Sequence, residues 1–208
     1  MTTRLVLVRH GQTDGNASGR SQGRRDVPLN ERGRKHARAL AEALSTRALA
    51  AVVSSPASRC HDTARAIAEP HGLAVALDPR LVELDQGELD GLTGEEMRAR
   101  FPGFLERWRA EDPSDLRMPG GETMREAQER MLAAAANLVR AHAGSEVAVV
   151  SHNLAIKALL CHALGAPLAG FRRLQLNVAS ISVVDVEPDG RWRVMSVNER
   201  CHDLASDG

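Results

Sequence analysis

The sequence predicts an α/β fold in which helices are layered on a sheet. Two observations predict it. Strand-like and helix-like stretches alternate along the 208 residues, and several strand-like stretches are apolar at every position, as in strands covered on both faces. The length suits one sizeable domain. We therefore expect residues 1–208 to form a single domain with a partly helical insertion at about 83–123, where Gly, Pro and charged residues are frequent.

Six stretches are expected to be strands, because they are apolar and end at polar or turn residues. They are residues 5–8, 51–54, 73–77, 147–150, 178–186 and 192–197. The last two are expected to form a hairpin, because Pro188-Asp189-Gly190 lies between them and is typical of a turn.

Five stretches are expected to be helices, because apolar residues recur at helical spacing and residues typical of helix ends flank them. The end signals are, in chain order, Asn30, Ser55-Pro56, the capping boxes of Thr93 with Glu96 and Thr123 with Glu126, and a stop at Gly165. The helices are expected over about 31–47, from 55–56 to 69, from 93, from 124 to 142 and from 154 to 164.

The charge balance excludes several classes of partner. Lys and Arg together number 27, as do Asp and Glu, so no net charge favours a nucleic acid or a membrane surface. No apolar run has the length of a membrane span. Any recognition of a charged ligand must therefore come from local clustering of side chains.

The cysteines and the N-terminus indicate a cytoplasmic protein without a metal. The opening MTTRLVLV lacks the basic and long apolar regions of a signal peptide, and three distant cysteines suggest reduced thiols. Each cysteine precedes a histidine. However, adjacent residues on a helix diverge by about 100°, and no CxxC or HxxxH spacing occurs, so we expect no metal site.

Three expected strands end in polar residues. LVLV runs into Arg9-His10, AVVSS leads to Arg59, and VAVV runs into Ser151-His152. Ligands of open α/β sheets bind beyond the carboxyl ends of the strands, so neighbouring strands would bring two arginines and two histidines together. Such a concentration of positive charge needs a partner of opposite sign, and phosphate fits the planar fork of arginine.

An ordered series of motifs resembles the histidine phosphatase (phosphoglycerate-mutase-like) superfamily over nearly the whole chain. The matching residues are Arg9-His10-Gly11-Gln12-Thr13, Asn16, Gln22-Gly23, Asp26, Pro28-Leu29, Gly33, Ser54-Ser55-Pro56, Arg59, Thr63-Ala64, Glu83-Leu84, Gly87, Gly120-Gly121-Glu122 and Ser151-His152. The resemblance implies a three-layer α/β/α sandwich with a mostly parallel central sheet, a phosphatase activity and no cofactor.

The sequence also departs from the family pattern. Asn153 stands where the family usually has glycine, and Glu83 is followed by LDQGELDGLT rather than the ERHYG-like run of true mutases. Phe101 to Trp108, Gly120 to Thr123 and the closing residues 198–202 look most like the metal-independent phosphoserine phosphatases. Gln86 stands where that subgroup is expected to carry a histidine.

The resemblance and the chemistry assign roles around the phosphate. A neutral imidazole can accept a phosphoryl group, and nearby guanidinium groups favour the neutral form, so His10 is the expected nucleophile. Arg9 and Arg59 are expected to hold the nonbridging oxygens. His152 is expected to add a donor as a cation, and Asn16 to donate from its amide.

Fewer signals mark the leaving-group side. Glu83 is the expected general acid, which must be protonated near neutrality. Gln22 and Gly23 are expected to border the leaving group, and the backbone of Asn153 to donate to the phosphate. His202 is expected to reach the substrate, although a loose tail fits the sequence equally well. The stripe of residues 101, 104 and 108 (Phe, Phe, Trp) fits either a lid or plain packing.

The expected activity is hydrolysis of a small phosphate ester through a phosphohistidine at His10. Two alternatives remain: a mutase that returns the phosphoryl group to another hydroxyl, and a sensor that binds a phosphorylated ligand without catalysis. Phosphoserine, a phosphosugar, a phosphoglycerate and α-ribazole phosphate are all open as substrates. A homodimer through a strand edge or the final helix is compatible with the sequence.

Overall fold

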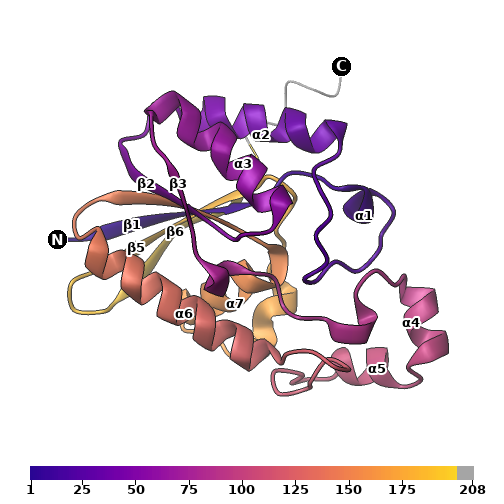
Figure 1. Cartoon of the computed structure of the whole chain (residues 1–208). Helices are drawn as coiled ribbons and strands as arrows, with labels where there is room; N and C mark the ends of the chain where they lie inside the picture. The colour runs from indigo at the N-terminus through magenta and orange to yellow at the C-terminus, as the bar shows by residue number, and fades with distance from the viewer. Residues whose placement is uncertain (201–208) are drawn as a thin grey trace.

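The computed structural model describes residues 1–200 and contains a six-stranded sheet of order β3-β2-β4-β1-β5-β6 (Figure 1). The strands are β1 (Thr3–Arg9), β2 (Leu49–Ser54), β3 (Val75–Leu77), β4 (Glu146–Ser151), β5 (Ile181–Val186) and β6 (Trp192–Glu199). β1, β2, β3 and β4 pair in parallel, whereas β5 and β6 form an antiparallel hairpin. All six expected strands are confirmed, and the sheet is mostly parallel as the resemblance implies.

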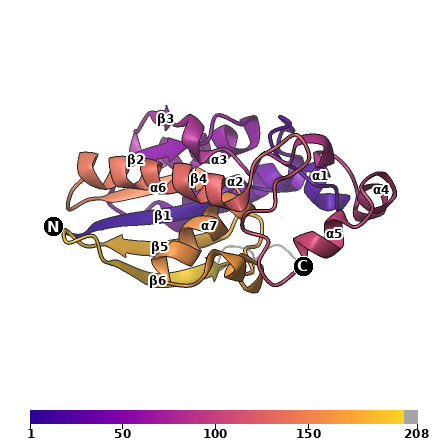
Figure 2. The same cartoon turned by 90° about the horizontal axis from the view of Figure 1, so that it is seen from below.

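Helices cover both faces of the sheet (Figures 1 and 2). Helices α2 (Glu31–Leu44) and α3 (Ser58–Ala68) pack on one face, and α6 (Met124–Ala141) and α7 (Asn153–Ala163) on the other. The first strand serves both layers, because Val6 and Val8 pack toward α2 and α3 while Leu5 and Leu7 pack toward α6 and α7. This explains why LVLV is apolar throughout, and the three-layer sandwich is confirmed.

Short helices lie beyond the carboxyl ends of the parallel strands, at the end of the sheet opposite the N-terminus (Figure 2). They are α1 (Asp14–Ala17), η3 (Gly87–Leu89), α4 (Gly94–Arg100) and α5 (Phe104–Trp108); η1 (Glu69–His71), η2 (Pro79–Leu81) and η4 (Leu168–Arg173) are further 3₁₀ turns. A third apolar cluster joins η3, α5 and the start of α6 to α7 and η4. Residues 83–123 are therefore partly helical, as expected.

The helix ends were only partly foreseen. Thr93 and Thr123 form the expected capping boxes, and the Asn30 side chain accepts from the backbone N–H of Gly33. The cap expected at Ser55-Pro56 is wrong: α3 begins at Ser58 after Ala57, which has no capping side chain. The carboxylate of Asp26, from a distant loop, accepts from both the N–H and the hydroxyl of Ser58, so tertiary packing supplies this cap.

Candidate active site

The polar residues that follow β1, β2 and β4 lie side by side. β4 is the neighbour of both β1 and β2, and Arg9 is paired in register with Ser151. The backbone N–H of His10 donates to the Ser151 carbonyl at 3.1 Å, and the rings of His10 and His152 meet edge to face with centroids 5.2 Å apart. The topology thus brings together both histidines.

His10 is buried and held in one tautomer. Its Nδ1 lies 2.7 Å from the carbonyl oxygen of Gly11, which can only accept, so Nδ1 carries the proton and Nε2 keeps its lone pair. Burial lowers the pKa of His10 well below its usual range, and the charges of Arg59 and Arg9 lower it further. The ring is therefore neutral near pH 7 and can act as a nucleophile through Nε2.

Two glycines fix the main chain around His10. A Cβ on Gly11 would lie 2.5 Å from the carbonyl oxygen of Gly33, and a Cβ on Gly33 would lie 2.0 Å from the carbonyl oxygen of Gln12. Any side chain at either position would force the first turn of α2 away from this loop. Both positions therefore require glycine for close backbone contact.

Two buried arginine head groups flank His10. Arg59, in the first turn of α3, is 1% exposed and donates to the carbonyl oxygens of Arg25 and Gly23 at 2.9 and 2.8 Å. Arg9 donates to the carbonyl oxygen of Leu176 at 2.6 Å. Neither forms an ion pair within residues 1–200, and the Nε atom of each is buried without a hydrogen-bond partner. These guanidinium groups have the charge and unused donors to bind an anion.

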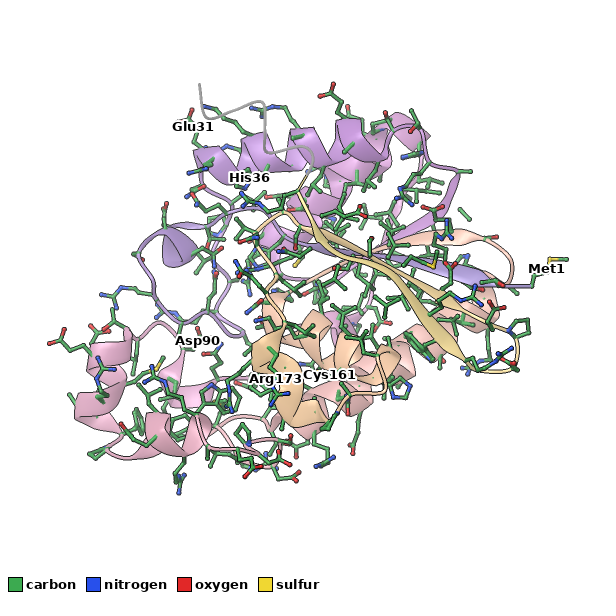
Figure 3. The ribbon with its side chains drawn as sticks, turned by 180° about the vertical axis from the view of Figure 1, so that it is seen from behind. Met1, Glu31, His36, Asp90, Cys161 and Arg173 are labelled. Carbon is green, nitrogen blue, oxygen red and sulfur yellow. The ribbon has the colours of Figure 1, made fainter. Side chains whose placement is uncertain are left out.

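Asp90 holds the loop that carries the two carbonyl oxygens bound by Arg59. Its carboxylate oxygens accept from the N–H groups of Gly23 and Arg25 at 2.9 and 2.8 Å. In Figure 3 Asp90 lies between this loop and the α4–α5 extension. Asp90 was not singled out from the sequence, because an Asp next to glycine is typical of many loops.

Asn16 and Gln22 join this loop to the segment that follows His10. The Gln22 Oε1 atom accepts from the Thr13 hydroxyl and the Asn16 amide at 2.9 and 3.3 Å, which leaves the Gln22 Nε2 donor buried without a partner. Gln86 accepts from the Ser21 hydroxyl, so its side chain is engaged with the same loop.

His152 is buried. It is 1% exposed, its Nε2 lies 2.8 Å from the Ser55 hydroxyl, and the Cys60 thiol is 3.4 Å from the same nitrogen. Burial, followed by the charges of Arg59 and His10, lowers the pKa of His152 well below its usual range. Burial beside positive charge therefore favours the neutral ring, and the cationic state expected of His152 beside phosphate stays a prediction.

Glu83 lies against the first turn of α7. It is 5% exposed; its Oε1 accepts from the N–H groups of Leu84 and Ala155 at 2.9 and 3.0 Å, and its Oε2 from Leu154 at 3.1 Å. Asn153 begins the same helix, and its Oδ1 is buried without a partner. Glu83 is thus oriented by backbone donors.

The remaining candidates lie elsewhere. Phe104 is 5% exposed inside the third apolar cluster, against which Phe101 and Trp108 are partly buried, and Trp108 meets Phe171. Packing, rather than a lid, accounts for this stripe. His202 lies outside the described residues. Within residues 1–200, no three His, Cys, Asp or Glu side chains are grouped as metal ligands, and no helix has the length and hydrophobicity to cross a membrane.

An α/β sheet whose strand ends gather a neutral histidine and two buried guanidinium groups defines an enzyme that binds phosphoryl groups. Residues 5–200 match the histidine phosphatase superfamily (branch 1). The chain therefore belongs to the histidine phosphatase superfamily, as the motif series indicates.

Its relatives include both phosphatases and mutase-like proteins. The chain is 35% identical to "Phosphoserine phosphatase 1" of Hydrogenobacter thermophilus, over 96% of this chain and 93% of the relative. It is 39% identical to "Probable phosphoglycerate mutase GpmB" of an Enterobacter species, over 88% and 85%. The solved mycobacterial glucosyl-3-phosphoglycerate phosphatase in complex with VO3 is similar at a TM-score of 0.86 and 36% identity, over 95% and 99%. The protein is a phosphoric monoester hydrolase that acts on small phosphorylated metabolites.

Proposed function

We propose that His10 is the nucleophile of this phosphatase and that phosphoserine is its substrate. The neutral His10 ring, with Nδ1 bound to Gly11 and with guanidinium groups on either side, is the observation that carries the proposal. The 35% identity to a phosphoserine phosphatase supports the choice of substrate.

The reaction proceeds in two steps. In the first, Nε2 of His10 forms a bond to phosphorus as the bond to the ester oxygen breaks, and Glu83 gives its proton to the leaving oxygen. In the second, Glu83 removes a proton from water as that water attacks phosphorus, which releases inorganic phosphate and restores His10. Glu83 is assigned this role because its buried carboxyl is held in one orientation by the N–H groups of Leu84, Leu154 and Ala155.

The other site residues bind the phosphoryl group and the leaving group. Arg9 and Arg59 hold the nonbridging oxygens, where the transition state concentrates charge. Asn16 donates from its amide. His152 hydrogen-bonds the same group, and the adjacent dianion favours its protonation on binding.

We assign recognition of the substrate to Gln22, Gly23, Asn153 and His202. Gln22 and Asn153 have buried polar atoms without partners, and Gly23 lies beside Arg59. Their place on the leaving-group side, together with that of His202, is part of this proposal.

Trapping of the phosphorylated protein tests the mechanism. Rapid acid-free quenching with labelled substrate should yield label that is stable to base and lost in acid, as a phosphoramidate is. His10→Ala should abolish trapping and turnover, whereas His142→Ala, at the C-cap of α6, should retain both. Turnover that persists in His10→Ala would refute the nucleophile.

Product analysis separates hydrolysis from the alternatives. Release of inorganic phosphate in step with the alcohol indicates a phosphatase. An isomeric phosphate ester indicates a mutase, the activity in the name of the GpmB relative. Tight binding of phosphoserine without turnover would indicate a sensor. A screen of phosphosugars, phosphoglycerates and α-ribazole phosphate against phosphoserine would rank the substrates.

We also propose that the chain is one domain, works in the cytoplasm without a metal, and forms a homodimer. The packing of the 83–123 segment on α7 supports a single domain. Full activity after dialysis against a chelator is expected, and a loss that magnesium reverses would contradict metal independence. Sedimentation would measure the oligomeric state.

A further inference from the structure

The Gly120-Gly121-Glu122 motif has no part in the proposed chemistry, yet it lies directly on the segment that follows Glu83. A Cβ on Gly121 would lie 2.2 Å from the carbonyl oxygen of Asp85. The N–H of Glu122 donates to that same oxygen at 2.9 Å. Close backbone contact therefore explains why residue 121 is glycine. It does not explain the side chain of Glu122.

Glu122 forms a two-pronged ion pair with Arg130 of α6. The guanidinium Nε donates to Oε1 at 2.7 Å and Nη2 donates to Oε2 at 2.9 Å, and the two side chains are only 15% and 11% exposed. Burial alone raises the pKa of Glu122, but the hydrogen bonds and charge of Arg130 outweigh it, so the net pKa lies below its ordinary value. The pair is thus charged and rigid.

Arg130 binds the main chain on the N-terminal side of Glu83. Its Nη1 donates to the carbonyl oxygens of Arg80 and Val82 at 2.7 and 2.6 Å, and its Nη2 donates to the carbonyl oxygen of Glu83 itself at 3.1 Å. Residues 82–86 lie between η2 and η3, outside any helix or strand. Their carbonyl groups therefore need donors from elsewhere, and Arg130 supplies those of Val82 and Glu83.

Glu122 binds the main chain on the other side. Its Oε2 accepts from the N–H of Asp85 at 3.1 Å. The pair therefore hydrogen-bonds the backbone both before and after Glu83. The carboxyl of Glu83 then meets the first turn of α7 in a single orientation.

We propose that the Arg130–Glu122 pair is a positioning pair that holds Glu83 where it can pass its proton to the leaving oxygen. The inference rests on the proposed role of Glu83 as general acid. Arg130 and Glu122 touch neither His10 nor the arginines that bind phosphate. Their loss should therefore impair proton delivery while leaving capture of phosphorus by His10 intact.

Two esters with different leaving groups separate these effects. An alkyl ester such as phosphoserine needs a proton on its leaving oxygen, whereas p-nitrophenyl phosphate releases a stable anion. General acid catalysis contributes about 10²–10⁴-fold, so Arg130→Met and Glu122→Gln should each lower kcat/KM for phosphoserine by about 10²-fold and for p-nitrophenyl phosphate by less than about fivefold. Arg130→Lys keeps a charged donor group, so its kcat/KM for phosphoserine should lie between those of the parent and Arg130→Met.

Arg125→Met is the matched control. Arg125 lies on the same helix and forms a two-pronged pair with Asp115 at 2.6 and 2.8 Å, but it makes no contact with residues 80–85. Arg125→Met should leave kcat/KM for both esters unchanged. Thermal unfolding of each variant shows whether it is folded. If Arg130→Met does not fold, Glu122→Gln, which keeps the shape of the side chain, still tests the proposal.

Glu83→Gln distinguishes the two ways of failing. If Glu83→Gln lowers kcat/KM, which reports the phosphorylation step, by the same factor for both esters, Glu83 is not the acid and the proposed mechanism is wrong. Suppose instead that Glu83→Gln lowers kcat/KM mainly for phosphoserine. If the Arg130 and Glu122 variants then lower kcat/KM equally for both esters, or for neither, the positioning role is wrong. A fall in kcat/KM mainly for phosphoserine in the Glu83, Arg130 and Glu122 variants supports the inference.

Discussion

Gly33 offers a test in which local helix preference and tertiary packing make opposite demands. It lies in the first turn of α2, and its N–H donates to the Asn30 side chain at 2.8 Å. An added Cβ would lie 2.0 Å from the carbonyl oxygen of Gln12 and 2.9 Å from the Gln12 nitrogen. Non-bonded atoms rest about 3.5 Å apart, so Gly33→Ala must move α2 and this loop apart by about 1.5 Å.

The magnitudes decide the outcome. Alanine is favoured over glycine inside a helix by about 1 kcal/mol, whereas overpacking a buried contact costs about 1–3 kcal/mol. The expected net loss of stability is therefore about 0–2 kcal/mol. The effect on activity is larger, because Gln12 is two residues from His10 and a 1 Å displacement of a catalytic group costs about 10²-fold.

Urea unfolding and kcat/KM measured on the same preparations test this reasoning. The matched control is Gly94→Ala at the start of α4, where a Cβ would meet only the Arg98 guanidinium at 3.9 Å. The control should keep full activity and gain slightly in stability. A Gly33→Ala variant that is more stable than the parent and equally active would refute the argument from close contact.

Two further predictions concern charge around the site. The lowered pKa values of His10 and His152 mean that these rings take up protons on unfolding below about pH 6.5. Their contribution to stability is therefore present above that pH and is lost as the pH falls, and urea unfolding should show a lower stability at pH 5.5 than at pH 7.5. Asp90→Asn leaves one N–H of the Arg59 loop without an acceptor, which costs about 1–3 kcal/mol. Competitive inhibition by inorganic phosphate should weaken about tenfold.

Matched variants keep these two predictions specific. Replacing both His10 and His152 by Gln should flatten the fall in stability between pH 7.5 and 5.5, and an unchanged slope would show that other groups cause it. Asp115→Asn makes the same chemical change at an exposed carboxylate that pairs with Arg125, and it should leave phosphate inhibition unchanged. Equal inhibition constants for Asp90→Asn and the parent would contradict the role given to Asp90.

The sheet and its site were predictable because their signals are local. Four consecutive apolar residues in β1 require a strand covered on both faces, and the capping boxes at Thr93 and Thr123 act within four residues. The order of the motifs along the chain then placed Arg9, His10 and His152 at adjacent strand ends, because parallel strands expose their carboxyl ends at one edge.

The supports of the site were not predictable, because each joins residues far apart in sequence. Asp26 caps α3 across 32 residues, Asp90 holds Gly23 across 67, and Arg130 holds Glu83 across 47. No local preference distinguishes these side chains from the surface aspartates and arginines around them. Their partners are main-chain groups, which every residue carries and no sequence pattern marks.

The sequence by itself determined which side chains gather beyond the strand ends, since residue type and chain order are enough to bring them to one edge of the sheet. Only the tertiary structure decided their charge and orientation. The pKa of His152 is lowered because burial and neighbouring positive charge act on it together. Glu83 has one orientation because backbone donors from α7 bind its carboxylate and Arg130 binds its carbonyl oxygen. Desolvation and hydrogen-bond geometry depend on what surrounds a side chain in space, and those surroundings exist only once the chain has folded.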